Sequence, residues 1–589
     1  MKDILISPDN NNVPEATKKA KDAYKTCLTD NLNYLREVSF IAKSEGMPIL
    51  QNIKEDFLKF GWNEIGDLVS TYGVPLLFNF DIVPFPVSTT DYLLELQDDT
   101  FPDPIMFHPQ ESMNYHEIMF KDFSRYASKY DEVDEKQDPF FIYLRTVLNV
   151  LKNKMNHNIK DEQITSGIKE VAKFMRDIKE YAGISKDANI KQITTTTVVE
   201  KLQQWTDEQF ENKAPINWLS YLGKIFNKSG ARVDLKTNIY VNSNYVYNVL
   251  NITRNTDPAV LKNFALIRIL LYSSFDGDRK IRTALFNYYK ARNHTIPSRP
   301  DYCANQILDI SSDGLVGLSL AASRLFTEEK RQMKAKSLVE KISESFKNKL
   351  LTSNWMDNKS KAAAMKKKEN MISLVGVPDF VGNNKQLNEF YENLRISSQD
   401  NYGNMQQLRA FRQNYSFSRL RRPRVRSYWD KSPFETNALY NRANNKFIIP
   451  LALLYPPFFR GDFGIMDYSH LGVLVGHETT HGFDNAGRKY DAFGVIGNLW
   501  TNETYSAFEN RSQCFREQYD RYFINELNKT LSGERSLNEN LADNGGLKIA
   551  YNAAKEVFKF YSFESDKFSP EQLFFIGFAT VRYLDLSTT

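Results

Sequence analysis

The chain has 589 residues, of which 42% are hydrophobic, so it is long enough to form two or more packed lobes. Its formal net charge is +4, and charged residues make up 25% of the sequence. This balance implies no strong electrostatic field that would attract nucleic acid or a membrane surface. The sequence contains no run of about 18 apolar residues, so we expect no membrane-spanning helix within it.

Helical periodicity dominates the first 385 residues. The pattern predicts a helix from about Val13 to Asn33, with Pro14 near its start. Residues 73–86 predict a strand with turns. Further helical stretches are predicted over residues 139–182, 258–290 and 315–351, with Asp257 as the N-cap of the second of these. Residues 1–385 therefore predict one large, mostly helical lobe.

Two segments are rich in basic residues. Residues 359–370 predict a lysine-rich helix, for which a solvated face is the simplest interpretation. Residues 419–426, RLRRPRVR, form the only dense basic cluster and could serve as a nucleic-acid patch or a localisation signal. Because no aromatic stacking platform accompanies the cluster, we expect a structural or solvent-facing role and no nucleic-acid partner.

Two short strands are predicted further along the chain. Residues 437–440, Asn-Ala-Leu-Tyr, predict an edge strand, and residues 446–454 predict a largely buried strand. A peptide can add itself to such an edge through main-chain hydrogen bonds.

The segment Leu471–Asp484, LGVLVGHETTHGFD, contains two histidines four residues apart. On a helix, His477 and His481 lie one above the other, so their rings can converge on a single metal ion. Glu478 is left free to act on a water held by that metal. This is the HExxH signature of zinc hydrolases, and the alternative is an amphipathic helix with two incidental histidines. The mostly apolar residues 471–475 would seat the helix in a core.

A second helical stretch, residues 538–546, offers a third ligand. Glu539 and Asp543 lie four residues apart on one helical face, and we expect the glycine pair at residues 545–546 to end the helix. Three protein ligands plus a water make a catalytic zinc site, whereas four ligands would close it. We assign Glu539 as the third ligand. Asp543, one turn on, can accept the outer N–H of a zinc-bound histidine.

With these two segments, the sequence resembles the neprilysin and endothelin-converting-enzyme family of zinc metallopeptidases. The resemblance runs through most of the chain, and its carriers are residues 437–440, 456–459, 476–484, 487–488, 498–500, Cys514 and 539–546. It implies a mainly α (α+β), two-lobed fold, in which a large helical lobe covers the cleft of a thermolysin-like catalytic lobe with a small sheet. The implied domains are a mainly helical N-terminal lobe, residues 1–385, and a zinc metallopeptidase domain, residues 386–589, incomplete at its C-terminus.

The resemblance also implies roles for individual residues. It implies one Zn²⁺ ion per chain, with ligands that match His477, His481 and Glu539. Glu478 matches the general base, and Asp543 and Asp484 match groups that orient the histidines. The family's Asn-Ala pair holds the substrate backbone, and this role falls on Asn437 and Ala438. Phe458, Leu453 and Leu474 lie near positions that line the family's apolar pocket, although core packing explains these apolar residues equally well.

The cysteines and the glycosylation sequons bear on localisation. Cys27 and Cys303 match two family cysteines that pair with each other, whereas the family partner of Cys514 lies beyond the end of this sequence. Three reduced thiols of a cytosolic protein are the alternative. Sequons occur at Asn227, Asn251, Asn293, Asn358, Asn414, Asn502, Asn510 and Asn528. The N-terminus has too short an apolar core for a signal peptide. An extracellular or plasma-membrane ectodomain is therefore inferred from the resemblance, with an anchor only in a full-length form.

The resemblance leads to one functional prediction and two alternatives. We expect a zinc metalloendopeptidase that hydrolyses oligopeptides on the amino side of hydrophobic residues. The family continues beyond this end with a histidine and an arginine that stabilise the oxyanion and grip the substrate. No histidine follows His481 here, Cys514 lacks its family partner, and the family's N-terminal cysteine-bearing segment is absent, so we expect a sequence truncated at both ends. If the missing tail is real, we expect weak or absent peptidase activity; if the sequence is incomplete, we expect the full protein to be an active ectoenzyme. The alternatives are a secreted, catalytically weak or inactive zinc-binding protein that binds peptides, and a helical scaffold with a coincidental HExxH.

Overall fold

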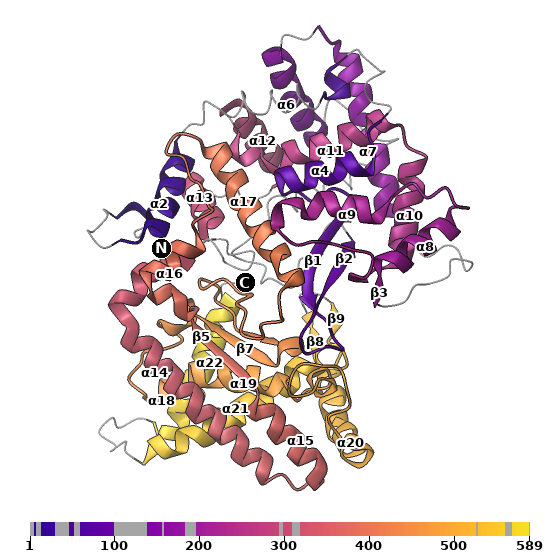
Figure 1. Ribbon diagram of the computed structural model, residues 1–589. Helices are drawn as coiled ribbons and strands as arrows, with labels where there is room; N and C mark the ends of the chain where they lie inside the picture. Colours follow the sequence, from indigo (N-terminus) through magenta and orange to yellow (C-terminus); the bar gives the residue numbers. More distant parts are fainter. Residues whose placement is uncertain are drawn as a thin grey trace. The chain divides into compact units, whose positions relative to one another are not determined.

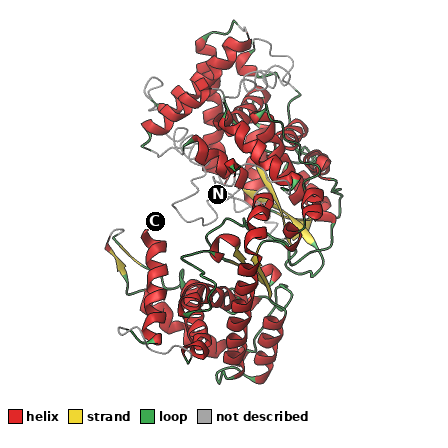
Figure 2. Ribbon diagram, turned by 90° about the vertical axis from the view of Figure 1, so that its left-hand side faces the viewer, coloured by secondary structure: helices red, strands yellow, loops and turns green. Residues whose placement is uncertain are grey.

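The computed structural model describes residues 5–7, 13–29, 46–51, 59–98, 138–155, 158–182, 196–277, 279–293, 298–308, 318–525, 528–559 and 568–587. Helices dominate and the strands form small sheets, which confirms the mainly α fold (Figures 1 and 2).

The chain divides into two compact units. Unit 1 comprises Met1–Val83, Asp91–Ile307 and Glu389–Pro423, and unit 2 comprises Pro84–Thr90, Leu308–Asn388 and Arg424–Thr589. The two units interleave along the chain, and the single boundary at residue 385 stays a prediction. Within the described ranges, no helix combines the length and the apolar character that crossing a membrane requires.

Unit 1 is built mainly from helices. They are α2 (Glu15–Leu28), α4 (Trp62–Tyr72), α6 (Pro139–Met155), α7 (Asp161–Ala182), α8 (Val199–Gln209), α9 (Trp218–Phe226), α10 (Ser243–Arg254), α11 (Pro258–Tyr272), α12 (Arg279–Ala291), α13 (Arg299–Leu308) and α17 (Asn401–Ser418). Helix α2 is the described part of the helix predicted over residues 13–33. Asp257 caps α11 as predicted, because its carboxylate accepts the N–H of Ala259 at 2.8 Å.

One four-stranded sheet belongs to unit 1. Its order is β1 (Phe78–Pro84), β2 (Tyr92–Asp98), β4 (Asn238–Tyr240) and β3 (Thr196–Val198). β1 falls within the strand predicted over residues 73–86. On this strand Phe78 is fully buried and stacks on Trp62, with 5.2 Å between the ring centroids. Trp218 and Tyr245 pack against the same ring, so the aromatic core joins β1 to α4, α9 and α10.

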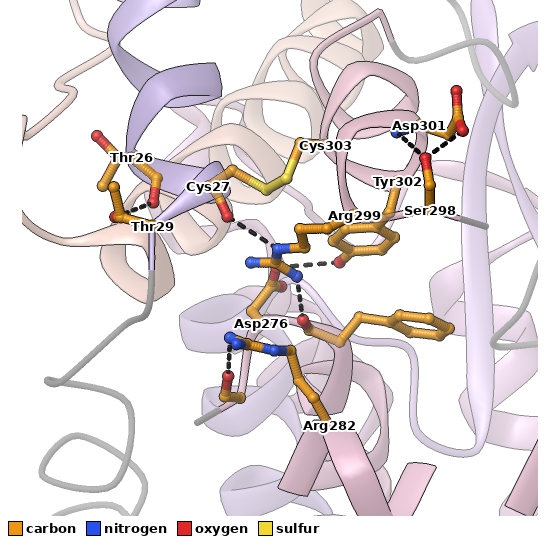
Figure 3. Close-up of a disulfide and its surroundings, with 12 residues drawn as sticks. Thr26, Cys27, Thr29, Asp276, Arg282, Ser298, Arg299, Asp301, Tyr302 and Cys303 are labelled. Carbon is orange, nitrogen blue, oxygen red and sulfur yellow. Dashed lines mark hydrogen bonds between the residues drawn. A yellow bond between two sulfur atoms is a disulfide. The ribbon is translucent and has the colours of Figure 1, made fainter. Parts of the chain in front are cut away.

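A disulfide between Cys27 and Cys303 ties α2 to α13, as the resemblance implied (Figure 3). Beside it, the Nε of Arg299 donates to the carbonyl oxygen of Cys27 at 2.8 Å. The hydroxyl of Tyr302, next to Cys303, donates to the fully buried Asp276 at 3.0 Å. The bridge therefore lies beside a buried polar network that also fixes the start of α13.

Unit 2 surrounds a smaller sheet with helices. Its helices are α14 (Leu318–Leu351), α15 (Asn358–Glu369), α18 (Ile465–Asp467), α19 (Val473–His481), α20 (Asn502–Tyr519), α21 (Leu537–Phe558) and α22 (Pro570–Ser587), and α16 (Asn384–Phe390) spans the change of unit. The strands are β5 (Ile372–Gly376), β7 (Lys446–Pro450) and β6 (Leu439–Asn441), in that order, with a separate hairpin of β8 (Phe523–Ile524) and β9 (Lys529–Thr530). β7 is central and buried throughout, and β6 lies at the edge, as predicted. The bounds differ from the predicted ones, because the edge strand begins at Leu439 and residues 451–454 form a 3-10 helix rather than a continuation of the buried strand.

The lysine-rich helix α15 corrects a prediction. Lys367 and Lys368 are 0% and 5% exposed, so this part of the helix faces the protein interior rather than solvent. Burial lowers the pKa of Lys367 to about 7, although the carboxylates of Asp484 and Asp491 oppose the shift. Burial likewise lowers the pKa of Lys368 to about 8. The composition of the helix indicated its positive charge. It did not indicate that the carbonyl oxygens of Gly487 and Tyr490 accept hydrogen bonds from Lys367.

The basic cluster at residues 419–426 has the structural role that we preferred. Arg421 pairs with Asp234 at 2.7 Å in unit 1. In unit 2, Arg424 donates to the carbonyl oxygen of Ser88 at 2.6 Å, and Arg426 donates to that of Asn370 at 2.6 Å. These guanidinium groups therefore hold loops in place.

Replacing both Cys27 and Cys303 by serine should lower the free energy of unfolding by about 2–4 kcal/mol, because the unfolded chain is no longer cross-linked. Thermal unfolding followed by circular dichroism should then show a lower Tm. Cys514→Ser is the matched control, since this thiol is free and exposed. An unchanged Tm in the double variant, or a Tm lowered equally in the control, would contradict the prediction.

Candidate metal centre

The two histidines of the motif end a helix that is set deep in unit 2. This helix begins with α18, passes through a π-helical turn at Tyr468–Gly472 and continues as α19 to His481. Leu471, Val473 and Val475 are 0%, 3% and 0% exposed, so the apolar run seats the helix in the core as predicted. π-turns of this kind occur inside α-helices and frequently lie at functional sites.

Helix α21 crosses α19 at unusually close range. A Cβ atom on Gly476 would lie 2.8 Å from the Cα of Gly546, and one on Gly546 would lie 2.5 Å from the backbone nitrogen of His477. Only hydrogen at these positions lets the two backbones touch. The prediction that the glycine pair ends the second helix is therefore wrong, because α21 continues through Gly545 and Gly546 to Phe558.

The crossing brings together three atoms that could bind a metal ion. The Oε2 of Glu539 lies 3.3 Å from the Nε2 of His477 and 3.4 Å from the Nε2 of His481, and the two Nε2 atoms lie 2.9 Å apart. Zinc binds nitrogen and oxygen at about 2.0–2.2 Å, so tetrahedral ligand atoms lie about 3.3–3.5 Å apart. The two distances to Glu539 already fit such an ion, and the distance between the two Nε2 atoms needs to increase by about 0.4 Å. Among the described residues, this is the group of acidic, histidine and cysteine side chains that could hold a metal.

The outer nitrogen of each ring is held by a carboxylate. The Nδ1 of His477 lies 2.8 Å from an oxygen of Asp543, and the Nδ1 of His481 lies 2.8 Å from an oxygen of Asp484. A carboxylate accepts hydrogen bonds only, so each Nδ1 carries a proton and each Nε2 is the ring atom that faces the centre and can bind a metal when it is unprotonated. Both aspartates therefore lie where the orienting groups were predicted.

The charges around the rings favour a cation. Burial alone lowers the pKa of His477, but hydrogen bonds to Asp543 and Glu539 outweigh burial and raise the pKa to about 9. Burial likewise opposes the hydrogen bonds of His481 to Asp484 and Glu539, which raise its pKa to about 10. The same hydrogen bonds to the histidines lower the pKa of Glu539. The surrounding carboxylates stabilise positive charge at the two imidazoles, so the centre is suited to a metal cation.

Accessibility differs among the three ligands. The side chains of His477 and His481 are 12% and 11% exposed, whereas that of Glu539 is 62% exposed. The centre is therefore buried on the helix side and open to solvent beside Glu539. Glu478 is buried, and burial raises the pKa of its carboxyl, while the charges of both histidines lower it. These interactions indicate that Glu478 lies within electrostatic range of the centre without being one of the converging ligands.

The predicted substrate residues lie at the start of the edge strand. Asn437 is exposed, Ala438 is buried, and β6 begins at the next residue. Helix α19, which carries the histidines, packs against β6 and β7 in unit 2. Among the pocket residues, Leu453 is fully buried in the core, whereas Phe458 and Leu474 are partly exposed and stay pocket predictions.

The loop after the helix contains residues whose positions the sequence did not explain. Arg488 stacks on Tyr505, with its guanidinium carbon 4.4 Å from the ring centroid, and also donates to Asn485 at 3.0 Å. Lys367 and Asn445 contact the same region from elsewhere in the chain. Only the lysine-rich composition and an asparagine pair at residues 444–445 hinted at them, and neither pattern is specific.

The fold and the motif together define the class of HExxH metalloproteases. The solved structure of Mycobacterium tuberculosis zinc metalloprotease Zmp1 in complex with an inhibitor matches the fold with a TM-score of 0.70 and 19% identity, over 96% of this chain and 80% of that chain. Two models of peptidase family M13 match residues 1–378 and 437–585. The chain belongs to peptidase family M13, a family of zinc metallopeptidases, which confirms the resemblance.

Two curated relatives illustrate the extent of the match. An endothelin-converting enzyme homolog of Locusta migratoria is 25% identical over 615 residues, which cover 99% of this chain and 77% of the relative. Neprilysin-1 of Caenorhabditis elegans is 30% identical over 366 residues, which cover 59% of this chain and 47% of the relative. The alignments thus reach about three quarters of the first relative and about half of the second.

Gly546→Ala should weaken zinc binding about tenfold or more, because the new methyl group must push α21, and with it Glu539 and Asp543, away from α19. The affinity can be measured by competition with a chelator of known strength. Gly223→Ala on α9 is the control, since a Cβ atom there meets nothing within 4 Å. Zinc binding by the Gly546→Ala variant at wild-type strength would contradict the proposed role of the helix crossing.

Proposed function

We propose that this chain is a zinc-dependent metalloendopeptidase that cleaves oligopeptides on the amino side of hydrophobic residues. The observation that carries the proposal is the convergence of two imidazole nitrogens and one carboxylate oxygen, with both imidazoles oriented by aspartates. Membership of peptidase family M13 supports the reaction class. The preference for hydrophobic residues rests on the resemblance and on the partly exposed Phe458 and Leu474.

His477, His481 and Glu539 would hold the zinc ion. When bound, zinc supplies Lewis-acid polarisation of the scissile carbonyl and lowers the pKa of a water molecule. Asp543 and Asp484 keep each Nε2 lone pair aimed at the centre. Because these carboxylates fix the rings before any metal arrives, little conformational freedom is lost on binding.

Glu478 takes the role of general base. Its carboxylate accepts a proton from the attacking water and returns that proton to the leaving amine. Burial raises its pKa above the usual value for a glutamate, which makes the carboxylate a better base near neutral pH. The charges of His477 and His481 oppose this rise.

The edge strand β6 gives the peptide a place to bind. An extended substrate can pair with the free edge of β6 through main-chain hydrogen bonds. Asn437, exposed at the entrance of the strand, can add a side-chain hydrogen bond, while the small side chain of Ala438 leaves room for the substrate backbone. An oligopeptide in extended conformation is therefore the substrate that this arrangement favours.

We also propose that the protein works outside the cytosol. Disulfides such as Cys27–Cys303 persist mainly in oxidising compartments. The sequon asparagines are exposed apart from Asn414, which is half-buried, so glycans can be attached to them without unfolding.

Glu478→Gln should lower kcat for a fluorogenic peptide by about 100- to 10,000-fold while one equivalent of zinc stays bound, because the amide cannot accept the proton. Zinc content can be measured by atomic emission on the same sample. Glu556→Gln, at an exposed position of α21, is the control and should retain full activity. A chelator should abolish cleavage by the wild-type protein.

The outcomes of this experiment separate the alternatives. Chelator-resistant cleavage, or full activity of the Glu478→Gln variant, would remove zinc or Glu478 from the mechanism. One equivalent of tightly bound zinc with peptide binding but no turnover would favour a peptide-binding protein. The absence of stoichiometric zinc would favour a scaffold with a coincidental motif.

A further inference from the structure

Lys367 is a fully buried lysine whose side chain binds the loop after the motif helix. Its Nζ donates to the carbonyl oxygens of Gly487 and Tyr490, each at 2.7 Å. A buried ammonium group is costly unless it is hydrogen-bonded. These two hydrogen bonds offset the cost of burying the ammonium group, and they require the loop, residues 482–490, to keep both carbonyl oxygens in place.

Gly487 links the lysine to the candidate metal centre. The N–H of Gly487 donates to Oδ1 of Asp484 at 2.6 Å, and the other oxygen of Asp484 lies 2.8 Å from Nδ1 of His481. Lys367 therefore binds the carbonyl oxygen of Gly487, and Asp484 binds the N–H group of the same residue. A Cβ atom on Gly487 would collide with the carbonyl oxygen of His481, so the loop turns tightly back onto the end of the helix.

The same lysine is tied to the edge strand through Asn445. The Nδ2 of Asn445 donates to the carbonyl oxygens of Lys367 and of Ala492, each at 2.9 Å. The hydroxyl of Tyr440, on β6, donates to the Oδ1 of Asn445 at 2.8 Å. Asn445 is fully buried and has a left-handed backbone with φ of 43°. Such a strained position persists where its surroundings fix it, and it often lies at a functional site.

We propose that Lys367 is a positioning residue that aligns His481 for metal binding, by fixing Gly487 and through it Asp484. The inference rests on the proposed zinc site and extends it to a side chain more than a hundred residues earlier in the chain. Removing the ammonium group frees the loop, so Asp484 no longer holds the imidazole of His481 in one orientation. Orienting groups one step from a metal ligand typically contribute about 10- to 100-fold in affinity.

Lys367→Met should therefore weaken zinc binding about tenfold, at the lower end of that range, since it acts one step further out. Methionine preserves most of the side-chain volume and removes the donor. Lys368→Met is the matched control, because this neighbouring lysine is also buried but is influenced by Lys347 and Glu344 on α14 rather than by the loop. The control should bind zinc like the wild type. Zinc affinity is measured by chelator competition on protein shown to be folded by circular dichroism.

A double-mutant cycle tests whether Lys367 acts through Asp484. Lys367→Met combined with Asp484→Asn should bind zinc as Asp484→Asn does alone, within about twofold, because both changes break one chain of contacts. Lys367→Met combined with Asp543→Asn should instead multiply the two losses, since Asp543 orients the other histidine. If the methionine variant does not fold, Lys367→Gln replaces it, because its amide can still donate one hydrogen bond.

Three results would overturn the inference. They are a Lys367→Met affinity within twofold of the wild type, an equal loss in Lys368→Met, and losses that multiply with Asp484→Asn. Failure of the wild-type protein itself to bind one zinc would instead remove the proposed function. The two failures are therefore distinguished by the wild-type titration.

Discussion

The close contact between α19 and α21 is the constraint on which the rest of this site depends. Two helices normally lie 8–10 Å apart because side chains separate them. Here Gly476 faces Gly546, and the missing side chains let the backbones meet. At this range the carboxylates of Glu539 and Asp543 on α21 reach the imidazoles on α19. The absence of side chains at residues 476, 545 and 546 thus brings the candidate metal ligands together.

Hydrogen bonds then fix what packing brings together. Each histidine uses one ring nitrogen for a carboxylate and keeps the other for the centre. The aspartates differ in how they are held. Asp543 sits on α21, so its position follows from the helix crossing, whereas Asp484 sits in a loop and is held by backbone N–H groups of Ala486 and Gly487. The loop needs further support, and the buried side chain of Lys367 supplies it.

Sequence reasoning predicted the three side chains that converge and the two aspartates beside the imidazoles, but not the helix crossing or the loop support that hold them. The spacing of His477 and His481 indicates one helical face, and the second motif supplies Glu539 and Asp543, because both features are local and periodic. The glycine pair was misread as a helix end, since glycine often ends helices and only the partner helix explains its use inside one. Lys367 was expected in solvent because charge is visible in a sequence, whereas the carbonyl oxygens that bind it come from residues 120 and 123 positions away.

The most direct test is the anomalous scattering of zinc in crystals of the wild-type protein loaded with one equivalent of the metal. The account predicts a single strong peak within about 2.0–2.2 Å of the Nε2 atoms of His477 and His481 and of a carboxylate oxygen of Glu539, with a water in the remaining position. A peak elsewhere, a fourth protein ligand at this centre, or no stoichiometric peak would contradict it.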